Sequence, residues 1–145
     1  KHTARPISYF QEESRKQPPR YDFAYITLSM DRRKLYERIE QRVDKMMASG
    51  LVEEVEGLIK RGYGRELNSM QALGYKEIAD YLHGSVSKDE AVRILKRDTR
   101  HYAKRQLTWF RGDKRVNWVD VDSFYRKEAI VENIIRYIAG KIPLI

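Results

Sequence analysis

Apolar side chains recur along most of this chain at intervals of three and four residues, the spacing of one face of an α-helix. The repeat breaks at Gly50, at the Gly62-Tyr63-Gly64 stretch and again before Ser87, so it predicts several separate helices. Two short stretches depart from the helical spacing and are rich in β-branched and aromatic residues, which favour strands. The pattern therefore predicts helices within residues 31–50, 51–61, 67–82, 87–111 and 122–140, and strands at 21–28 and 116–121.

The starts of these helices can be assigned from side chains that accept hydrogen bonds from free backbone N–H groups. Ser29 or Asp31 can cap the helix after the first strand. The stretch Ser87-Lys88-Asp89-Glu90 has the spacing of a capping box. Asp122 or Ser123 is expected to cap the last helix. In that helix, the apolar stripe expected to face a core consists of Ala129, Ile130, Ile134, Ile135 and Ile138.

Residues 21–28 carry apolar side chains on both alternating sets of positions, which is typical of a strand buried on both faces in a parallel sheet. Such a strand needs neighbours, and residues 116–121 are the only other candidate. We therefore expect further sheet partners outside these 145 residues. The expected fold class is α/β: mostly helical, with one buried core strand and a short second strand.

Residues 1–20 differ from the rest, because they are polar and contain Pro6, Pro18 and Pro19 with little apolar periodicity. This composition predicts a linker or connector.

Positive charge is concentrated in one segment of the chain. Residues 93–115 hold nine Lys or Arg side chains against Asp98 and Asp113, whereas the whole chain has a formal net charge of +8. A basic helix that ends in aromatic residues suits contact with phosphates and bases. The alternative is a merely solvated helix face, with Trp109 and Phe110 in a core.

Other features exclude several classes of protein. The chain has no cysteine, so it forms no disulfide or thiolate metal site, and its three histidines lack the spacing of metal ligands. It has no run of 18 apolar residues and no signal-peptide pattern at its start, so we expect no membrane contact. The length allows one domain with a real core.

Two further stretches are candidate binding residues on spacing alone. Arg38, Arg42 and Lys45 share a helix face just after the first strand, where they could clamp a phosphate or simply pair with nearby carboxylates. Gln71, Tyr75 and Lys76 could contact nucleic acid or form a polar exterior. Gly74 is expected at a helix start, since no phosphate-binding GxxxxGK[ST] motif occurs in the sequence.

The residue order carries a further signal. The stretch at 99–111, TRHYAKRQLTWFR, closely resembles the C-terminal signature of bacterial tRNA dimethylallyltransferases, also called tRNA isopentenyltransferases. Further blocks resemble the same family in the same order: ITLSMDR at 26–32, LYERIEQRVDKM at 35–46, GLVEE at 50–54 and GYKE at 74–77. The resemblance runs from about residue 21 to residue 140.

The resemblance implies a function and a fold. Family members transfer a dimethylallyl group from its diphosphate to N6 of the adenosine 3′ of the anticodon, and they need Mg²⁺. Their fold is a P-loop nucleoside-kinase-like α/β core with helices that grip the anticodon stem-loop. The P-loop and the catalytic Asp lie in the N-terminal half, and neither motif is present here. Residues 21–145 are thus expected to be the C-terminal part, following a connector at 1–20, and to be inactive alone.

The resemblance also implies roles for particular residues. Arg38 or Arg42 is expected to face the diphosphate, no catalytic or metal-binding residue is expected in this part, and Mg²⁺ is expected to be bound mainly by the missing half and the diphosphate. A cytoplasmic monomer is expected. The resemblance implies tRNA contact for the whole stretch 104–111. Within it, we expect Lys104 and Arg105 to contact RNA and Trp109 to pack in a core. The residues expected to bind tRNA are Gln71, Ala72, Leu73, Gly74, Tyr75, Lys76, Lys104, Arg105, Gln106, Leu107, Thr108, Trp109, Phe110 and Arg111.

Two other functional classes stay open at this point. One is a non-catalytic helical module that binds nucleic acid through the same basic helix. The other is a protein-interaction domain whose basic face meets an acidic partner.

Overall fold

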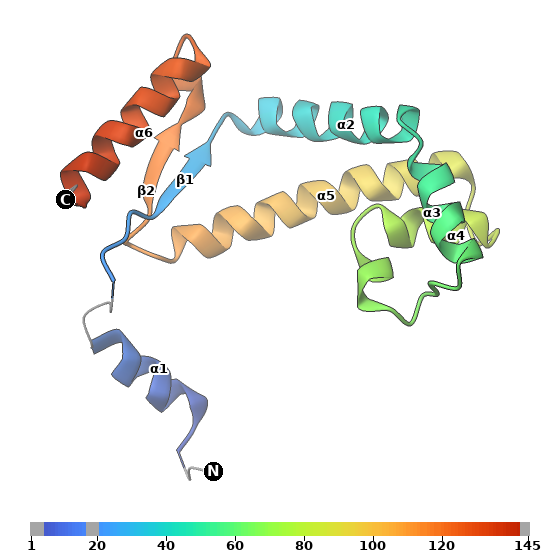
Figure 1. Ribbon diagram of the computed structural model, residues 1–145, viewed down its shortest axis with the longest axis horizontal. Coiled ribbons are helices and arrows are strands. Elements are labelled where there is room, and N and C mark those ends of the chain that lie inside the picture. The colour runs from blue at the N-terminus through green and yellow to red at the C-terminus, as the bar shows by residue number, and fades with distance from the viewer. Residues whose placement is uncertain (1–4, 17–20, 143–145) are drawn as a thin grey trace.

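The computed structural model describes residues 5–16 and 21–142 of the chain. It is mostly helical, with one two-stranded parallel sheet (Figure 1). The two strands and α6 lie at one end of the long helix α5, and α3 and α4 lie at its other end (Figure 1). The elements in chain order are α1 (Ile7–Lys16), β1 (Ile26–Ser29), α2 (Arg32–Ala48), α3 (Leu51–Lys60), η1 (Asn68–Gln71), α4 (Tyr75–Leu82), α5 (Lys88–Arg111), β2 (Asn117–Asp120), η2 (Val121–Ser123) and α6 (Lys127–Lys141).

The hydrophobic core lies where α2, α3, η1, α4 and α5 meet. Burial of these apolar side chains is the main stabilising contribution, at roughly 1.5–3 kcal/mol for each large side chain fully removed from water. The helical stripes predicted for α2 and α3 are confirmed, since Val43 and Val55 point into this core. The buried cluster consists of Val43, Leu51, Val55, Met70, Ile78, Ala79 and Leu95.

Local signals fix the ends of the core helices as expected. The Asp31 side chain accepts hydrogen bonds from the backbone N–H groups of Arg33 at 2.9 Å and Lys34 at 3.2 Å, which caps α2. The turn from α2 to α3 needs a left-handed backbone at Gly50, where φ is +94°. Gly74 has φ of +101° and starts α4, as expected.

β1 pairs with β2 in parallel, with Leu28 opposite Val119 and Ser29 opposite Asp120. The strand predicted at residues 21–28 is shorter in the structure, Ile26–Ser29, and its burial on both faces stays a prediction about partners outside these 145 residues. Leu28 is 53% exposed, and the buried side chain of the sheet is Val119 on β2, at 4% exposure. The faces of a sheet are covered by helices or by a second sheet, so burial of β1 on both faces would require elements beyond the described residues.

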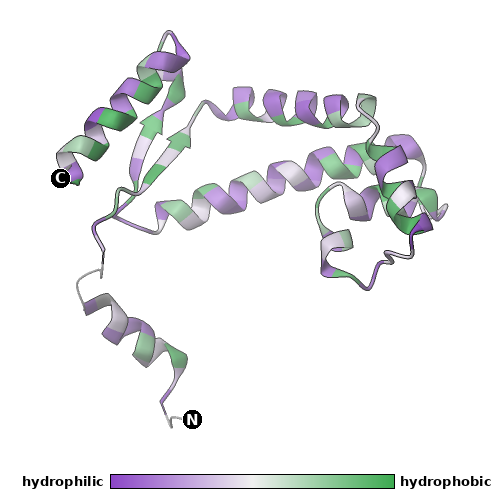
Figure 2. Ribbon diagram, viewed as in Figure 1, coloured by the Kyte–Doolittle hydropathy of each residue, from purple (hydrophilic) through white to green (hydrophobic). Residues whose placement is uncertain are grey.

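The last helix also differs from the prediction. Neither Asp122 nor Ser123 caps it, because the chain first makes η2 and an extended stretch, and α6 begins only at Lys127. Its apolar stripe is only partly buried by the described residues: Ile135 is 60% exposed, whereas Ala129, Ile130, Ile134 and Ile138 are half-buried. Figure 2 shows hydrophobic bands along α6, beside β2.

The N-terminal segment is not structureless. Residues expected to be a connector form α1, a ten-residue helix set apart from the body of the molecule (Figure 1). The guanidinium of Arg5 lies 4.2 Å from the ring centroid of Tyr9, which packs edge to face against Phe10. Local contacts therefore accompany a helix that the weak apolar periodicity did not reveal. Pro18 and Pro19, part of that expectation, lie outside the described residues. In the described ranges, no helix is both long and apolar enough to cross a membrane.

Candidate functional site

The basic helix α5 divides into two halves by the fate of its positive charges. In the N-terminal half, four cations form ion pairs, two of them with carboxylates on α2: Lys96 with Asp44 at 2.7 Å and Arg100 with Glu40 at 2.6 Å. The other two, Arg93 and Arg97, pair within α5 itself. The first two pairs join α5 to α2, and the other two neutralise charges within α5.

In the C-terminal half, the cations are free. Lys104, Arg105 and Arg111 are exposed. Within residues 5–16 and 21–142, no carboxylate lies within ion-pair distance of any of the three. The unpaired positive charges of the C-terminal half therefore form a local patch at the end of α5 near the strands. We call this the α5 basic patch (Lys104, Arg105 and Arg111).

An aromatic side chain accompanies this patch. Trp109 is 67% exposed, so the prediction that it packs in a core is wrong. Its ring packs edge to face on Phe110, with centroids 5.0 Å apart. Phe110 in turn contacts Tyr25 and is half-buried, so the sheet end anchors Phe110 and leaves Trp109 outside. A shallow hollow on this outer face is lined by His101, Lys104, Arg105, Thr108 and Trp109.

The other predicted residues of α5, including Arg111 of the basic patch, lie on a different surface. Gln106, Leu107, Phe110 and Arg111 line a groove of about 670 Å³ at the carboxyl ends of β1 and β2. We call it the strand-end groove. The residues predicted at 104–111 thus line two different surfaces, an outer hollow and an inner groove. The sequence pattern predicted a single binding surface.

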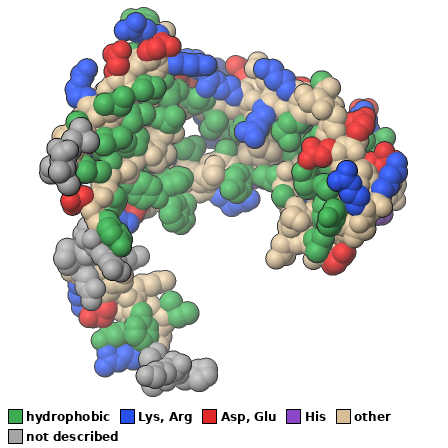
Figure 3. All heavy atoms as spheres, in the orientation of Figure 1, with side chains coloured by type: hydrophobic (Ala, Val, Ile, Leu, Met, Phe, Trp, Pro, Cys, Tyr) green, Lys and Arg blue, Asp and Glu red, His purple; other side chains and the backbone are tan. Residues whose placement is uncertain are grey.

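The strand-end groove is the position at which parallel sheets commonly bind ligands. It lies between the start of α2, the C-terminal half of α5, and the segment from η2 to α6. In Figure 3, hydrophobic side chains gather over the strands and α6, and Lys and Arg side chains gather along α2. The charged side chains that line the groove are Lys34, Arg38, Arg111, Asp122, Arg126 and Lys127.

The groove distinguishes Arg38 from Arg42, which the sequence left as equal candidates for facing the diphosphate. Arg38 lines it. Arg42 lies one turn further along α2 and instead lines a second hollow with Arg38, Gln41 and Lys45. Only Arg38 of the pair is in position to meet a ligand at the strand ends.

A clamp at the edge of the groove joins the two strand ends. Asp122 accepts a hydrogen bond from the backbone N–H of Asp31 at 2.6 Å and pairs with the Lys34 ammonium at 2.7 Å. These contacts hold the pKa of the Asp122 carboxyl below its usual value, the Asp31 N–H chiefly and Lys34 second. The hydrogen bond and charge of Asp122 raise the pKa of Lys34.

Sequence reasoning missed Lys34, Asp122, Arg126 and Lys127 as groove residues. Asp122 was assigned to a helix cap, although its place directly after a strand was a signal that could have found it. Arg126 and Lys127 carried no such signal, because the sequence did not reveal the extended stretch that brings them to the groove.

The predicted segment 71–76 lies at the far end of α5 from the basic patch. Gln71 and Ala72 are exposed, Leu73 packs against the core, and Gly74 is buried. The Gln71 side chain donates to the backbone carbonyl of Arg65 at 2.5 Å. Tyr75 donates its hydroxyl to Glu54, and this bond raises the tyrosine pKa.

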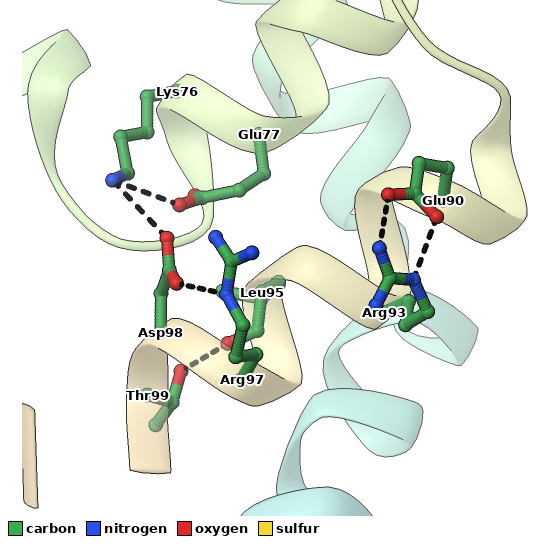
Figure 4. A network of polar contacts seen from close by, with 8 residues as sticks. All are labelled: Lys76, Glu77, Glu90, Arg93, Leu95, Arg97, Asp98 and Thr99. Carbon is green, nitrogen blue, oxygen red and sulfur yellow. Dashed lines mark hydrogen bonds and ion pairs between the residues drawn. The ribbon is translucent and has the colours of Figure 1, made fainter. Parts of the chain in front are cut away.

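Lys76 belongs to a charged network (Figure 4). Its ammonium lies 3.2 Å from a carboxylate oxygen of Glu77 and 3.6 Å from Asp98. Glu77 is only 3% exposed, and its other oxygen accepts the Gly74 backbone N–H at 2.8 Å. The Glu77 carboxylate is the main cause of the raised pKa of Lys76. Lys76 therefore offsets a buried negative charge.

The described residues bring together no group of three or more His, Asp or Glu side chains that could hold a metal ion.

Comparisons with known proteins show the family of this chain. The sequence matches the family described as IPP transferase over residues 1–113. A tRNA dimethylallyltransferase of Acetivibrio thermocellus is 56% identical over 138 residues, which cover 95% of this chain and 44% of that protein. Another, from Pelotomaculum thermopropionicum, is 48% identical over 138 residues, again 95% of this chain and 44% of the relative.

A solved structure is similar as well. The full-length tRNA isopentenylpyrophosphate transferase from Bacillus halodurans superimposes with a TM-score of 0.78 at 45% identity, over 90% of this chain and 43% of that protein. The chain thus spans less than half the length of the relatives it matches. On the family match and on these identities, the chain belongs to the IPP transferase family, whose curated relatives are tRNA dimethylallyltransferases.

Proposed function

We propose that this chain is the C-terminal part of a tRNA dimethylallyltransferase and that it supplies much of the tRNA-binding surface. The whole protein would transfer a dimethylallyl group from dimethylallyl diphosphate to N6 of the adenosine 3′ of the anticodon. Family membership and the share of the relatives' length that the chain covers support this assignment.

One observation carries the tRNA-binding part of the proposal: the α5 basic patch has no ion-pair partner in the described chain, whereas the four cations from Arg93 to Arg100 in the same helix are all paired. Unpaired, exposed Lys and Arg side chains neutralise phosphates and release counterions. The exposed Trp109 beside them offers a face for a displaced base.

The strand-end groove supports a role near the leaving group. Allyl transfer expels diphosphate, so cations near that group stabilise the negative charge that develops on it. Neither Arg38 nor Arg42 forms an ion pair within the described residues, but Arg38 lines the groove and Arg42 does not, which favours Arg38 as the diphosphate contact. Mg²⁺ would be held mainly by the diphosphate and by the part of the protein outside this chain, since no described cluster could hold it.

The open sheet supports a larger α/β core. In the described chain β1 and β2 pair only with each other, so each has an outer edge at which further strands of a P-loop nucleoside-kinase-like core would pair. In such an arrangement the strand-end groove would face the diphosphate-binding loop of the N-terminal half.

The test is transfer by the full-length protein. Purified protein is incubated with tRNA, labelled dimethylallyl diphosphate and Mg²⁺, and the labelled tRNA is digested to locate the modified nucleoside. Label on the adenosine 3′ of the anticodon is the expected result. tRNA binding without transfer would instead favour the non-catalytic nucleic-acid-binding module.

A further inference from the structure

The strand-end groove contains one acidic side chain, Asp122, among its cations. A diphosphate is repelled by a carboxylate, so an acid in an anion-binding groove must be neutralised or must serve another purpose. Asp122 is neutralised: one oxygen lies 2.7 Å from the Lys34 ammonium, and the other accepts the Asp31 N–H. Asp122 is then not available to the ligand, and Lys34 has one of its three N–H donors committed to Asp122.

The contacts of Asp122 extend to the first turn of α2. Asp122 holds the backbone of Asp31, and the Asp31 side chain holds the backbone N–H groups of Arg33 and Lys34. These bonds link the end of β2 to the start of α2, although the two are about ninety residues apart in the chain. Arg38 follows Lys34 by four residues on the same helix, so the direction of α2 at this clamp sets where Arg38 enters the groove.

A second set of bonds fixes Asp122 itself. Its backbone N–H donates to the Asp120 side chain at 3.1 Å, which caps η2 at the end of β2. Asp120 is paired in register with Ser29 of β1. The clamp is therefore built on the sheet, which is the rigid part of the groove wall.

We propose that Asp122 is a positioning residue for transfer: it fixes the start of α2 against the strand ends so that Arg38 meets the diphosphate. This inference rests on the proposed function, because it assigns the groove to the diphosphate. Asp122 touches no reacting atom. It acts through Asp31 and Lys34 on Arg38.

The experiment uses the full-length protein and measures KM for dimethylallyl diphosphate, KM for tRNA and the inhibition constant of inorganic diphosphate. Asp122→Ala is expected to raise KM for dimethylallyl diphosphate and the inhibition constant of diphosphate about tenfold, because it misplaces Arg38. KM for tRNA should not change, because the RNA-binding surface is not altered. Asp122→Asn keeps an acceptor for the Asp31 N–H and should recover most of the loss. Lys34→Met leaves that bond in place and should have a smaller effect than Asp122→Ala.

Asp113→Ala is the matched control. Asp113 also accepts a backbone N–H and pairs with an arginine, in this case both from Arg115, but it does not line the strand-end groove. Asp113→Ala should lower the melting temperature by about as much as Asp122→Ala does. It should leave both KM values and the inhibition constant unchanged. Melting curves confirm that each variant is folded at the assay temperature.

Arg38→Ala separates two hypotheses: that the strand-end groove binds the diphosphate, and that Asp122 positions Arg38 in it. If Arg38→Ala raises both diphosphate constants and Asp122→Ala leaves them within twofold of the parent, the positioning role is wrong and the groove assignment stands. If neither variant changes them, both the groove assignment and the positioning role fail. Equal losses in Asp122→Ala and Asp113→Ala would also overturn the proposal, because they would mark a general loss of stability.

Discussion

The ammonium of Lys76 lies 3.6 Å from the carboxylate of Asp98, and this contact joins the start of α4 to the middle of α5. The same ammonium faces the buried Glu77, whose second oxygen caps the N-terminus of α4 through Gly74 (Figure 4). The segment expected to contact tRNA at 71–76 is therefore held by an ionic network against the helix that carries the basic patch.

Glu77 is expected to be important for stability. Glu77→Ala removes the cap of Gly74 and leaves Lys76 without its closest carboxylate, so it should lower the free energy of unfolding by about 1–3 kcal/mol. Glu77→Gln keeps an oxygen for the Gly74 N–H and should lose less. Urea denaturation followed by circular dichroism measures both, and a Glu77→Ala variant as stable as the parent would show that the network contributes nothing.

Asp98 is expected to make stability depend on pH in the acid range. The Arg97 side chain is the main cause of its lowered pKa, with Lys76 contributing. A carboxyl whose pKa is lowered by folding stabilises the native state above its ordinary pKa of 3.8 and loses this contribution as the pH falls through the folded-state value. The melting temperature of Asp98→Asn should thus be below that of the parent at pH 6, and the gap should close below about pH 3.8. A gap that does not change with pH would contradict this assignment.

Trp109 should affect binding rather than stability. Because its ring is largely exposed, Trp109→Ala is expected to cost less than about 1 kcal/mol of stability, well below the roughly 3–5 kcal/mol of a buried Trp. In the full-length protein, the loss should instead appear as weaker tRNA binding or slower transfer. A large fall in melting temperature with normal binding would return Trp109 to a packing role.

Residues 1–145 alone should not transfer a dimethylallyl group. The sequence lacks a GxxxxGK[ST] loop, and the described residues gather no metal-binding cluster. Incubation of this fragment with tRNA, labelled dimethylallyl diphosphate and Mg²⁺ is the check, with the full-length protein as the positive control. Labelled tRNA above background would place catalytic groups in these residues.

Much of the fold follows from local sequence. The helical stripe of α2, the Asp31 cap and the glycines at 50 and 74 were all predictable, because caps and positive φ depend on nearby residues. The burial of β1 and α6 was not, because their apolar faces depend on partners beyond the described residues. The N-terminal helix escaped because its apolar spacing is weak.

The site was predictable to a smaller extent. Sequence placed the basic stretch correctly, but it could not show that Lys96 and Arg100 are neutralised by carboxylates on α2 while Lys104 and Arg105 are free. That distinction depends on which helix faces lie against each other. For the same reason, the sequence predicts a core position for Trp109, which is exposed while its neighbour Phe110 packs on Tyr25, and a helix cap for Asp122, which instead binds the start of α2.

The central claim is that the free cations at the end of α5 bind tRNA. Its most direct test is the salt dependence of tRNA binding by full-length protein carrying Lys104→Ala and Arg105→Ala. The matched control is Lys60→Ala with Arg93→Ala, which removes the same two residue types from ion-paired, exposed positions. Both double variants change the net charge equally, so any difference between them reports local contact.

Removal of one cation that neutralises a phosphate should reduce the slope of log affinity against log salt concentration by about 0.7–0.9. The Lys104 and Arg105 double variant should therefore bind tRNA more weakly at low salt, with a slope reduced by up to about 1.8, and the control should match the parent. If the slope and affinity of the Lys104 and Arg105 double variant equal those of the control, the basic patch does not contact tRNA.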